Sequence, residues 1–261
     1  MTNAISFMTA NYVARETGYA MHGWGHGDRT TNEAFEPLET YADRIDALFA
    51  DIAALGFGTV DVWGAHLSPE WATDVHVDAA LAALASHGLH VSTYATWIGP
   101  GNVERACELA RALGASLIGG GFSGEPEALA PALERHGVRL AVENHREKTP
   151  ADVIAKLERG GPMFGATVDT GWWGTQGYDA ALAIEELGDR VWHVHLKDVL
   201  AAGEPHETCR WGNGIVPIAR CVEALRASSY AGAIAVEHEP ETVDPTDDIR
   251  AMRAELEDWL R

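Results

Sequence analysis

The sequence predicts a (β/α)8 barrel, because short β-like runs alternate with amphipathic helical runs along the whole chain. Such alternation gives a parallel sheet, since parallel strands need crossover connections. The 261 residues suit one barrel and one domain over 1–261. A doubly wound open sheet is the alternative, but it usually carries a glycine-rich phosphate turn after its first strand. The sequence has no GxGxxG or Walker spacing there, and we interpret Gly119–Gly121 as a tight loop.

Eight runs rich in β-branched, aliphatic and aromatic residues are the predicted strands. They cover residues 5–9, 59–63, 90–96, 116–120, 139–145, 164–169, 191–196 and 233–237. The helical runs, chosen by apolar spacing and by glycine or proline at their ends, cover 39–55, 77–86, 102–113, 126–135, 150–160, 179–187, 217–227 and 246–260. The stretch 10–37 is rich in Gly, His and Trp and has no sustained helical period. We expect it to be a long functional loop.

Composition excludes several classes of partner. The formal net charge of −20 disfavours binding to nucleic acid and to acidic membrane surfaces. The sequence has no apolar run of about 18 residues and no basic-then-apolar N-terminal leader, so we expect neither a membrane span nor secretion. The three cysteines, Cys107, Cys209 and Cys221, form no CxxC pair, which favours a reducing cytoplasm. A small, neutral or metal-chelating substrate fits this surface.

Four consecutive predicted strands, the fifth to the eighth, end on side chains that can bind metal: Glu143, Asp169, His195 and Glu237. Barrel enzymes carry their chemistry at the C-terminal ends of their strands. Each of these residues alone could serve a salt bridge or a loop cap. Together they are harder to explain structurally, because buried carboxylates need partners and no arginine lies at neighbouring strand ends. Three carboxylates and one imidazole suit Mn²⁺, Mg²⁺ or Co²⁺, whereas structural zinc favours thiolates.

Two further residues are candidates for catalysis. His145 lies two positions beyond Glu143 on the same side of an extended strand and can act as general base or acid; the alternative is a core histidine. Lys197 lies two positions beyond His195 and can hold a substrate oxygen or stabilise an enolate. Its alternative role is an ion pair with Asp198 or another carboxylate.

Aromatic residues gather after the strand ends and in the first long loop, where indoles offer a stacking surface for a sugar face or an aromatic ring. The predicted substrate-binding residues are Trp24, His26, Trp63, Trp97, Trp172 and Trp173. Loop packing is the alternative for any one of them. His22, His26 and Asp28 could form a second metal site, a lid or a solvated loop, and His238 and Glu239 are expected to support the neighbouring Glu237.

The strings VENH, VDTGW, HVHLKD and VEHE, with Gly212-Asn-Gly214, resemble the xylose-isomerase-like barrel superfamily over essentially the whole chain. That superfamily includes sugar phosphate isomerases, ketose 3-epimerases, inosose dehydratases and hydroxypyruvate isomerases. The resemblance implies that Glu143, Asp169, His195 and Glu237 bind one divalent metal, with Mn²⁺ the first choice, and that the two glutamates also shuttle protons. Ketose 3-epimerases carry His, Arg and Glu where this chain has Trp172, Ala201 and Thr149, so their sugar-binding set is absent.

The chain also resembles the catalytic α subunit of C-glycoside deglycosidases, which work with a small β-rich partner subunit in a hetero-oligomer. This resemblance implies a metal-dependent lyase that removes a proton α to a sugar ketone, cleaves a 3-oxo-C-glycoside and releases an aromatic aglycone. A sugar (phosphate) isomerase or ketose epimerase is the alternative, since the same proton abstraction serves both outcomes. An abasic-site endonuclease shares the barrel, but the charge and the few histidines speak against it. A non-catalytic scaffold barrel predicts no tightly bound metal.

Overall fold

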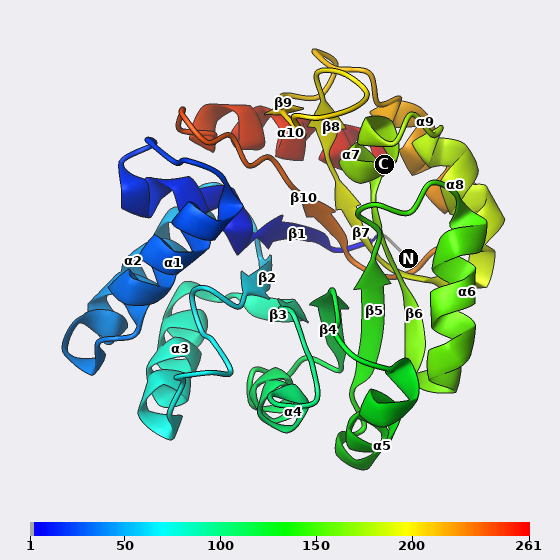
Figure 1. The fold of residues 1–261 in the computed structure, drawn as a ribbon. Coiled ribbons are helices and arrows are strands. Elements are labelled where there is room, and N and C mark those ends of the chain that lie inside the picture. The colour runs from blue at the N-terminus through cyan, green and yellow to red at the C-terminus, as the bar shows by residue number, and fades with distance from the viewer. Residues whose placement is uncertain (1–2) are drawn as a thin grey trace.

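The computed structural model describes residues 3–261 and confirms the predicted (β/α)8 barrel. Eight parallel strands close in the order β1-β10-β7-β6-β5-β4-β3-β2, so strands from the two ends of the chain lie side by side (Figure 1). The strands are β1 (Ile5–Met8), β2 (Thr59–Trp63), β3 (His90–Ala95), β4 (Leu117–Gly120), β5 (Arg139–Glu143), β6 (Phe164–Asp169), β7 (Val191–Leu196) and β10 (Ile234–Val236). A small antiparallel pair, β8 (Asp198–Val199) and β9 (Thr208–Cys209), lies outside the barrel.

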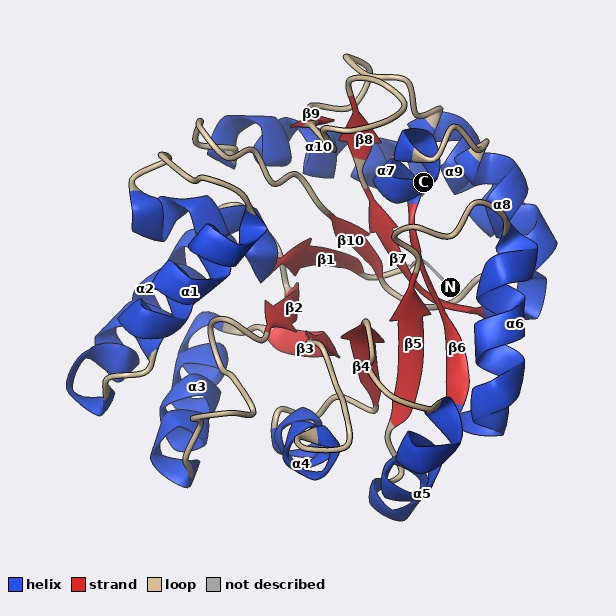
Figure 2. Cartoon of the chain, in the orientation of Figure 1, coloured by secondary structure: helices blue, strands red, loops and turns tan. Residues whose placement is uncertain are grey.

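Helices surround the strands, as Figure 2 shows. They are α1 (Trp24–Phe35), α2 (Leu38–Ala54), α3 (Asp74–His87), α4 (Val103–Ala112), α5 (Pro126–His136), α6 (Pro150–Gly160), α7 (Thr170–Thr175), α8 (Ala180–Leu187), α9 (Ile218–Ala227) and α10 (Thr246–Trp259). Short 3-10 segments cover Thr9–Thr17, Gly161–Met163 and Gly188–Arg190. No helix within residues 3–261 is long and apolar enough to cross a membrane.

The prediction of a long loop over residues 10–37 is wrong. A 3-10 segment covers Thr9–Thr17, and α1 begins at Trp24. Gly27, Thr31 and Phe35 form the buried face of α1 at a spacing of four residues. The glycine is needed because a Cβ at position 27 would lie 2.2 Å from the Met21 Sδ. Close packing, rather than an apolar stripe, therefore fixes this helix, and so the hydrophobic pattern did not reveal it.

The strands have an apolar outer face and a polar inner one. Outward residues such as Val60 and Val62 are buried in the main hydrophobic core against the helices. Inside the barrel, Thr93 and Thr167 are fully buried beside Gly119, whose absent Cβ would lie 2.8 Å from the Thr93 Cγ2. A polar interior can hold titratable groups in fixed positions, and the candidate site is built on it.

Candidate metal centre

The structure brings the four predicted strand-end residues together. Glu143 ends β5, Asp169 ends β6, His195 lies one residue before the end of β7, and Glu237 directly follows β10. Each offers one ligand atom, and these atoms all lie within 4.8 Å of one another. We call Glu143, Asp169, His195 and Glu237 the carboxylate cluster.

Strand register explains part of this convergence. Asp169 pairs with His195 across β6 and β7, so both side chains leave the sheet at the same level. The Glu237 N–H donates to the Leu196 carbonyl at 3.1 Å, which continues the β7–β10 ladder by one residue. Asn144 holds the Asp169 backbone from both sides: its Oδ1 accepts from the Asp169 N–H at 2.9 Å, and its Nδ2 donates to the Asp169 carbonyl at 3.0 Å. Backbone pairing therefore places these ligand atoms before any cation arrives.

Within the cluster, the His195 Nδ1 lies 2.7 Å from the Glu143 Oε1 and 3.3 Å from the Glu237 Oε2. Burial alone would lower the pKa of His195, but Glu237 and Glu143 hold that pKa well above its usual range. Burial alone would raise the pKa of Glu237, but Lys197 and His195 hold it well below its usual range. The carboxylates therefore draw a proton onto the imidazole when no cation is bound.

Lys197 places a positive charge next to the carboxylate cluster. Its Nζ lies 2.9 Å from the Asp169 Oδ2, 3.1 Å from the Glu237 Oε2 and 2.8 Å from the Glu239 Oε2. The ammonium group is almost fully buried, with 3% of the side chain exposed. The predicted alternative partner, Asp198, instead accepts the backbone N–H groups of Gly212, Gly214 and Val216. Lys197 thus belongs to the cluster's surroundings and also lines the cavity above it.

The donor set fits a divalent cation. Among the described residues, the buried Asp169 Oδ2, Glu237 Oε2 and His195 Nε2 make no hydrogen bond, although Lys197 stands near both oxygens. Burial raises the pKa of Asp169 to about 6, and the charges of Glu237 and Glu143 add to this rise, since Lys197 and His195 do not fully compensate for them. Buried carboxylate oxygens without a hydrogen bond are costly, and a hard cation would satisfy them.

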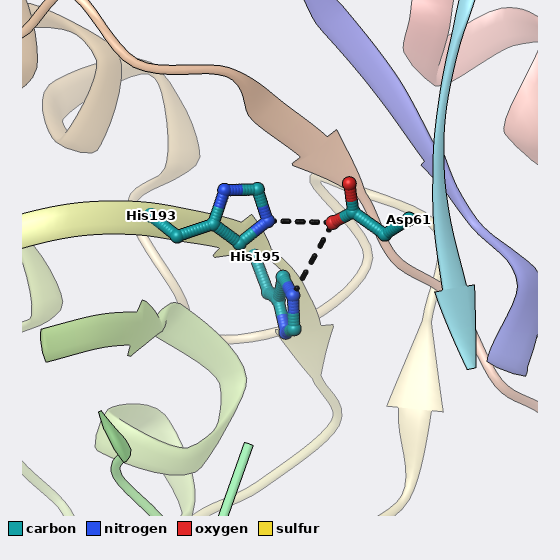
Figure 3. A group of neighbouring side chains, drawn as sticks. All are labelled: Asp61, His193 and His195. Atoms are coloured by element: carbon teal, nitrogen blue, oxygen red, sulfur yellow. Dashed lines mark hydrogen bonds and ion pairs between the residues drawn. The ribbon is translucent and has the colours of Figure 1, made fainter. Parts of the chain in front are cut away.

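A second cluster lies deeper in the barrel, and sequence analysis missed it. The Asp61 Oδ2 accepts a hydrogen bond from the His193 Nε2 at 2.5 Å and lies 3.6 Å from the His195 Nε2 (Figure 3). Its Oδ1 accepts from the hydroxyl groups of Ser6 and Ser92. β2 and β7 are not neighbours in the barrel, so the Asp61–His193 contact crosses its interior. We call Asp61, His193 and His195 the aspartate–histidine cluster.

The sequence did contain a signal for this second cluster. His193 and His195 stand two positions apart, so their side chains leave β7 on the same side. Asp61 alternates with the outward Val60 and Val62 in β2 and is fully buried. A carboxylate on the inner side of one strand and two histidines on the inner side of another are enough to suggest a contact.

A cavity of about 300 Å³ opens above the carboxylate cluster. Its lining residues are Met8, Ala10, Trp24, Asp28, Trp63, Trp97, Glu143, His145, Trp172, Lys197, His206, Glu237 and Glu239. Trp24, Trp63, Trp97 and Trp172 are thus four predicted substrate-binding residues that lie at the cavity. The predicted base also lies here: the His145 ring stands between Trp97 and Trp172, and its Nε2 is 3.5 Å from the Glu143 Oε2.

Two predicted substrate-binding residues lie elsewhere. Trp173 is fully buried in the hydrophobic core and cannot contact a substrate, because α7 directs it away from the cavity that Trp172 lines. His26 does not line the cavity; its ring stacks on His22, and its Nδ1 accepts the His22 N–H. The prediction for Trp173 is wrong, because Trp172 and Trp173 are neighbours on a helix and point in different directions, whereas a role for His26 stays a prediction.

Two wall residues were not predicted to bind substrate. The His206 ring stacks on Trp172 with centroids 3.9 Å apart, and burial lowers the pKa of His206 to about 3. The Asp28 Oδ1 accepts a hydrogen bond from the Trp63 indole at 2.9 Å, so Asp28 supports the cavity wall. Neither role could be anticipated, since both depend on contacts between residues more than 30 positions apart in the chain.

Comparison with known proteins agrees with the fold. Residues 49–261 match the family model described as xylose isomerase-like TIM barrel. The chain belongs to this family. No curated protein matches it in sequence.

Solved structures share the barrel at low sequence identity, which supports the fold alone. D-allulose 3-epimerase from Methylomonas sp. is 16% identical with a TM-score of 0.71, covering 100% of this chain and 99% of its own. The probable 3-DHS dehydratase AsbF from Bacillus anthracis is 15% identical with a TM-score of 0.70, covering 97% and 98%. A 3-keto-D-glucoside 4-epimerase from E. coli is 19% identical with a TM-score of 0.62, covering 82% and 94%.

Proposed function

We propose that this protein is a divalent-metal-dependent enzyme that removes a proton α to a sugar ketone. We further propose that its reaction is lyase cleavage of a 3-oxo-C-glycoside with release of an aromatic aglycone. The observation that carries the proposal is the position of His145. This half-buried imidazole lies beside a buried carboxylate cluster and close to two indole rings in a cavity of about 300 Å³.

In this proposal Glu143, Asp169, His195 and Glu237 hold the cation, and Mn²⁺ is our first choice. A bound divalent cation supplies Lewis-acid stabilisation of the negative charge that develops on a ketone oxygen. The ligand set has three carboxylates and one imidazole, which suits Mn²⁺, Mg²⁺ or Co²⁺. His195 would have to be neutral to hold the cation, so binding would be accompanied by loss of the proton that the carboxylates favour there.

The side chains then have separate tasks. His145 takes the proton from the carbon next to the ketone, with Glu143 beside its Nε2 to stabilise the imidazolium that forms. Lys197 stays charged because three carboxylates surround it, and it adds positive charge on the side of Asp169 and Glu237. Trp24, Trp63, Trp97 and Trp172 position the sugar and exclude water.

Elimination follows from the position of the leaving group. In a 3-oxo-glycoside, loss of the C2 proton leaves an electron pair that forms the C1–C2 double bond. The bond from C1 to the aglycone carbon breaks, its electron pair goes to the aglycone, and that carbon takes up one proton. The sugar leaves as an unsaturated ketone, so the reaction needs no external oxidant or reductant.

The names of two structural neighbours are in line with this reading. One is described as acting on a 3-keto-D-glucoside and another as a probable dehydratase, which is an eliminating enzyme. We also propose, from the resemblance to C-glycoside deglycosidases, that a small β-rich subunit accompanies the barrel.

The test is release of free aglycone from a 3-oxo-C-glucoside by the Mn²⁺-loaded protein together with its candidate partner subunit. We expect release from the wild type and a fall of roughly 100- to 10,000-fold in His145→Gln. The matched control is His90→Gln, since His90 is exposed at the start of β3, the opposite end of that strand from the cavity. Absence of release from the complete complex would remove the lyase assignment.

A sugar isomerase or ketose epimerase is the second candidate, favoured by the neighbour described as a D-allulose 3-epimerase. The same base and the same cation site serve it, but the proton returns to a carbon and no bond to an aglycone breaks. Exchange of solvent deuterium into a free ketose, without cleavage of the glycoside, would support this candidate instead.

A further inference from the structure

A second, larger groove adjoins the central cavity. Its volume is about 690 Å³, and it is lined by residues of the β4–α5 loop, of the β5–α6 loop and of α6. The lining residues are Gly121, Phe122, Gly124, Glu125, Pro126, Val142, Arg146, Glu147, Lys156 and Arg159, with Trp97, Glu143, His145 and Trp172. Those last four residues also line the central cavity. We call this space the outer groove.

The shared residues make the outer groove continuous with the proposed reaction centre. A cavity of about 300 Å³ lies at the lower end of the range of about 300–1,000 Å³ for ligand pockets, which suits a single sugar ring. A group bonded to the sugar beside His145 would pass between Trp97 and Trp172 into the outer groove. The position next to the proposed base is therefore where a leaving group would be held.

The walls of the outer groove are built for an aromatic group. Trp97 keeps 54% of its surface exposed there. Its ring lies directly against the backbone at Gly121, where a Cβ would come within 2.1 Å of the indole Cζ3. Phe122 is fixed by an edge-on contact with Phe164, with centroids 5.7 Å apart. An exposed indole that lies against the backbone of a glycine is a preformed stacking surface.

The charges of the outer groove leave one cation without a partner. Lys156 forms an ion pair with Glu147, and Arg159 forms ion pairs with Glu125 and Glu127. Arg146 is exposed and forms no ion pair with any residue of 3–261. In a chain of net charge −20, an unpaired guanidinium beside His145 is a local exception. Guanidinium groups recognise carboxylates with two parallel hydrogen bonds.

We infer that the outer groove binds the leaving-group half of the substrate, and that this half is an aromatic ring system carrying a carboxylate that Arg146 recognises. The inference rests on the proposed function for the place of this group in the reaction. Binding of the aromatic acid itself depends only on the stacking surface of Trp97 and on the charge of Arg146. The two ideas can therefore fail separately.

The probes are 6-hydroxy-2-naphthoate and 6-hydroxy-2-naphthamide, which share a ring system and differ in charge. Calorimetric titration of the Mn²⁺-loaded protein should show the naphthoate binding at least about tenfold more tightly than the amide. Arg146→Met keeps an apolar stem without the charge. In this variant the affinity for the naphthoate should fall to the affinity for the amide. The matched control is Arg250→Met, because Arg250 pairs with Asp247 inside its own helix.

A second variant tests the stacking surface. Gly121→Ala should weaken the binding of both naphthalene compounds to a similar extent, because the new Cβ displaces the Trp97 ring while Arg146 keeps its charge. Equal affinities for naphthoate and amide in the wild type, no binding of either, or a naphthoate affinity unchanged in Arg146→Met would each overturn the inference. Arg146-dependent binding of the naphthoate in a protein that cleaves no 3-oxo-C-glucoside would sink the lyase proposal and leave the inference standing.

Discussion

The carboxylate cluster and the aspartate–histidine cluster share His195 but differ in how their charges are balanced. In the aspartate–histidine cluster, one carboxylate accepts hydrogen bonds from two serines and one histidine. In the carboxylate cluster, three carboxylates have one histidine and one lysine, and two of their buried oxygens make no hydrogen bond. The number of donors per carboxylate therefore separates a cluster whose charge is balanced internally from one in which a divalent cation could be held.

This difference appears in the pKa values of the two buried aspartates. Burial would raise the pKa of Asp61, but His193 and His195 hold it below its usual range. Burial raises the pKa of Asp169 to about 6, and Lys197 does not reverse the shift. The pKa values of two equally buried aspartates in one barrel are thus shifted in opposite directions, and the predictions below start from this contrast.

The largest expected effect is on the carboxylate cluster. Asp169→Asn removes one ligand charge, and we expect metal affinity to fall at least about a hundredfold and aglycone release at least about a thousandfold, or about 4 kcal/mol. Calorimetric titration with Mn²⁺ and the release assay measure the two effects. The matched control is Asp51→Asn, since Asp51 is exposed on α2. Unchanged Mn²⁺ affinity in Asp169→Asn would remove Asp169 from the metal site.

The aspartate–histidine cluster should respond mainly in stability. Asp61→Leu leaves His193 without its buried partner, and we expect a loss of about 3–5 kcal/mol in the free energy of unfolding. Urea denaturation of the metal-free protein measures it. If the cluster were instead the metal site, Asp61→Leu would weaken Mn²⁺ binding more than Asp169→Asn does.

In the metal-free protein, lowering the pH should change the contributions of Asp169 and Asp61 to the free energy of unfolding in opposite directions. Between pH 6 and 4 the folded state binds more protons at Asp169 than the unfolded state does, because the folded pKa of about 6 exceeds the unfolded value of 3.8. Lowering the pH across this window therefore stabilises the fold through Asp169, by about 2 kcal/mol. Asp61 contributes stability that is present above pH 3.8 and is lost below it.

Denaturation curves at pH 6 and pH 4 for wild type and Asp169→Asn isolate the Asp169 contribution as a difference. We expect the wild type to gain more stability than Asp169→Asn on going from pH 6 to pH 4. An equal response of the two proteins would mean that Asp169 is already ionised in the folded state at pH 4, and that its carboxylate is as well compensated as that of Asp61.

The smallest effect should come from the cavity wall. Trp172→Ala removes stacking against the substrate and against His206, so we expect the KM of the glycoside to rise about three- to tenfold, in line with about 0.5–1.5 kcal/mol for an aromatic contact. Affinity for Mn²⁺ should stay unchanged, since Trp172 contributes only its backbone N–H to Asp169. A large fall in metal affinity would show that the indole of Trp172, and not the cluster alone, positions Asp169.

The sequence predicted the barrel and the convergence of four strand-end side chains because both follow from local signals. Strands β2, β6 and β7 begin and end where the apolar runs begin and end, and Glu143, Asp169, His195 and Glu237 stand at or next to strand ends. The helix at Trp24–Phe35 escaped because close packing at Gly27 defines it. Asp61 was missed although the alternation of its strand places it inside the barrel with His193 and His195, and His206 escaped because its partner Trp172 lies on a distant segment. Trp173 was misassigned because the direction of a side chain on a short helix depends on tertiary packing.

The most direct test of the central claim is a crystal structure of the Mn²⁺-loaded protein with anomalous scattering data collected at the manganese edge. We predict one strong peak at about 2.0–2.6 Å from ligand atoms of Glu143, Asp169, His195 and Glu237. The peak should vanish in Asp169→Asn crystals and persist in Asp51→Asn crystals. A structure with no peak at this position, or with the only peak beside Asp61 and His193, would contradict the account.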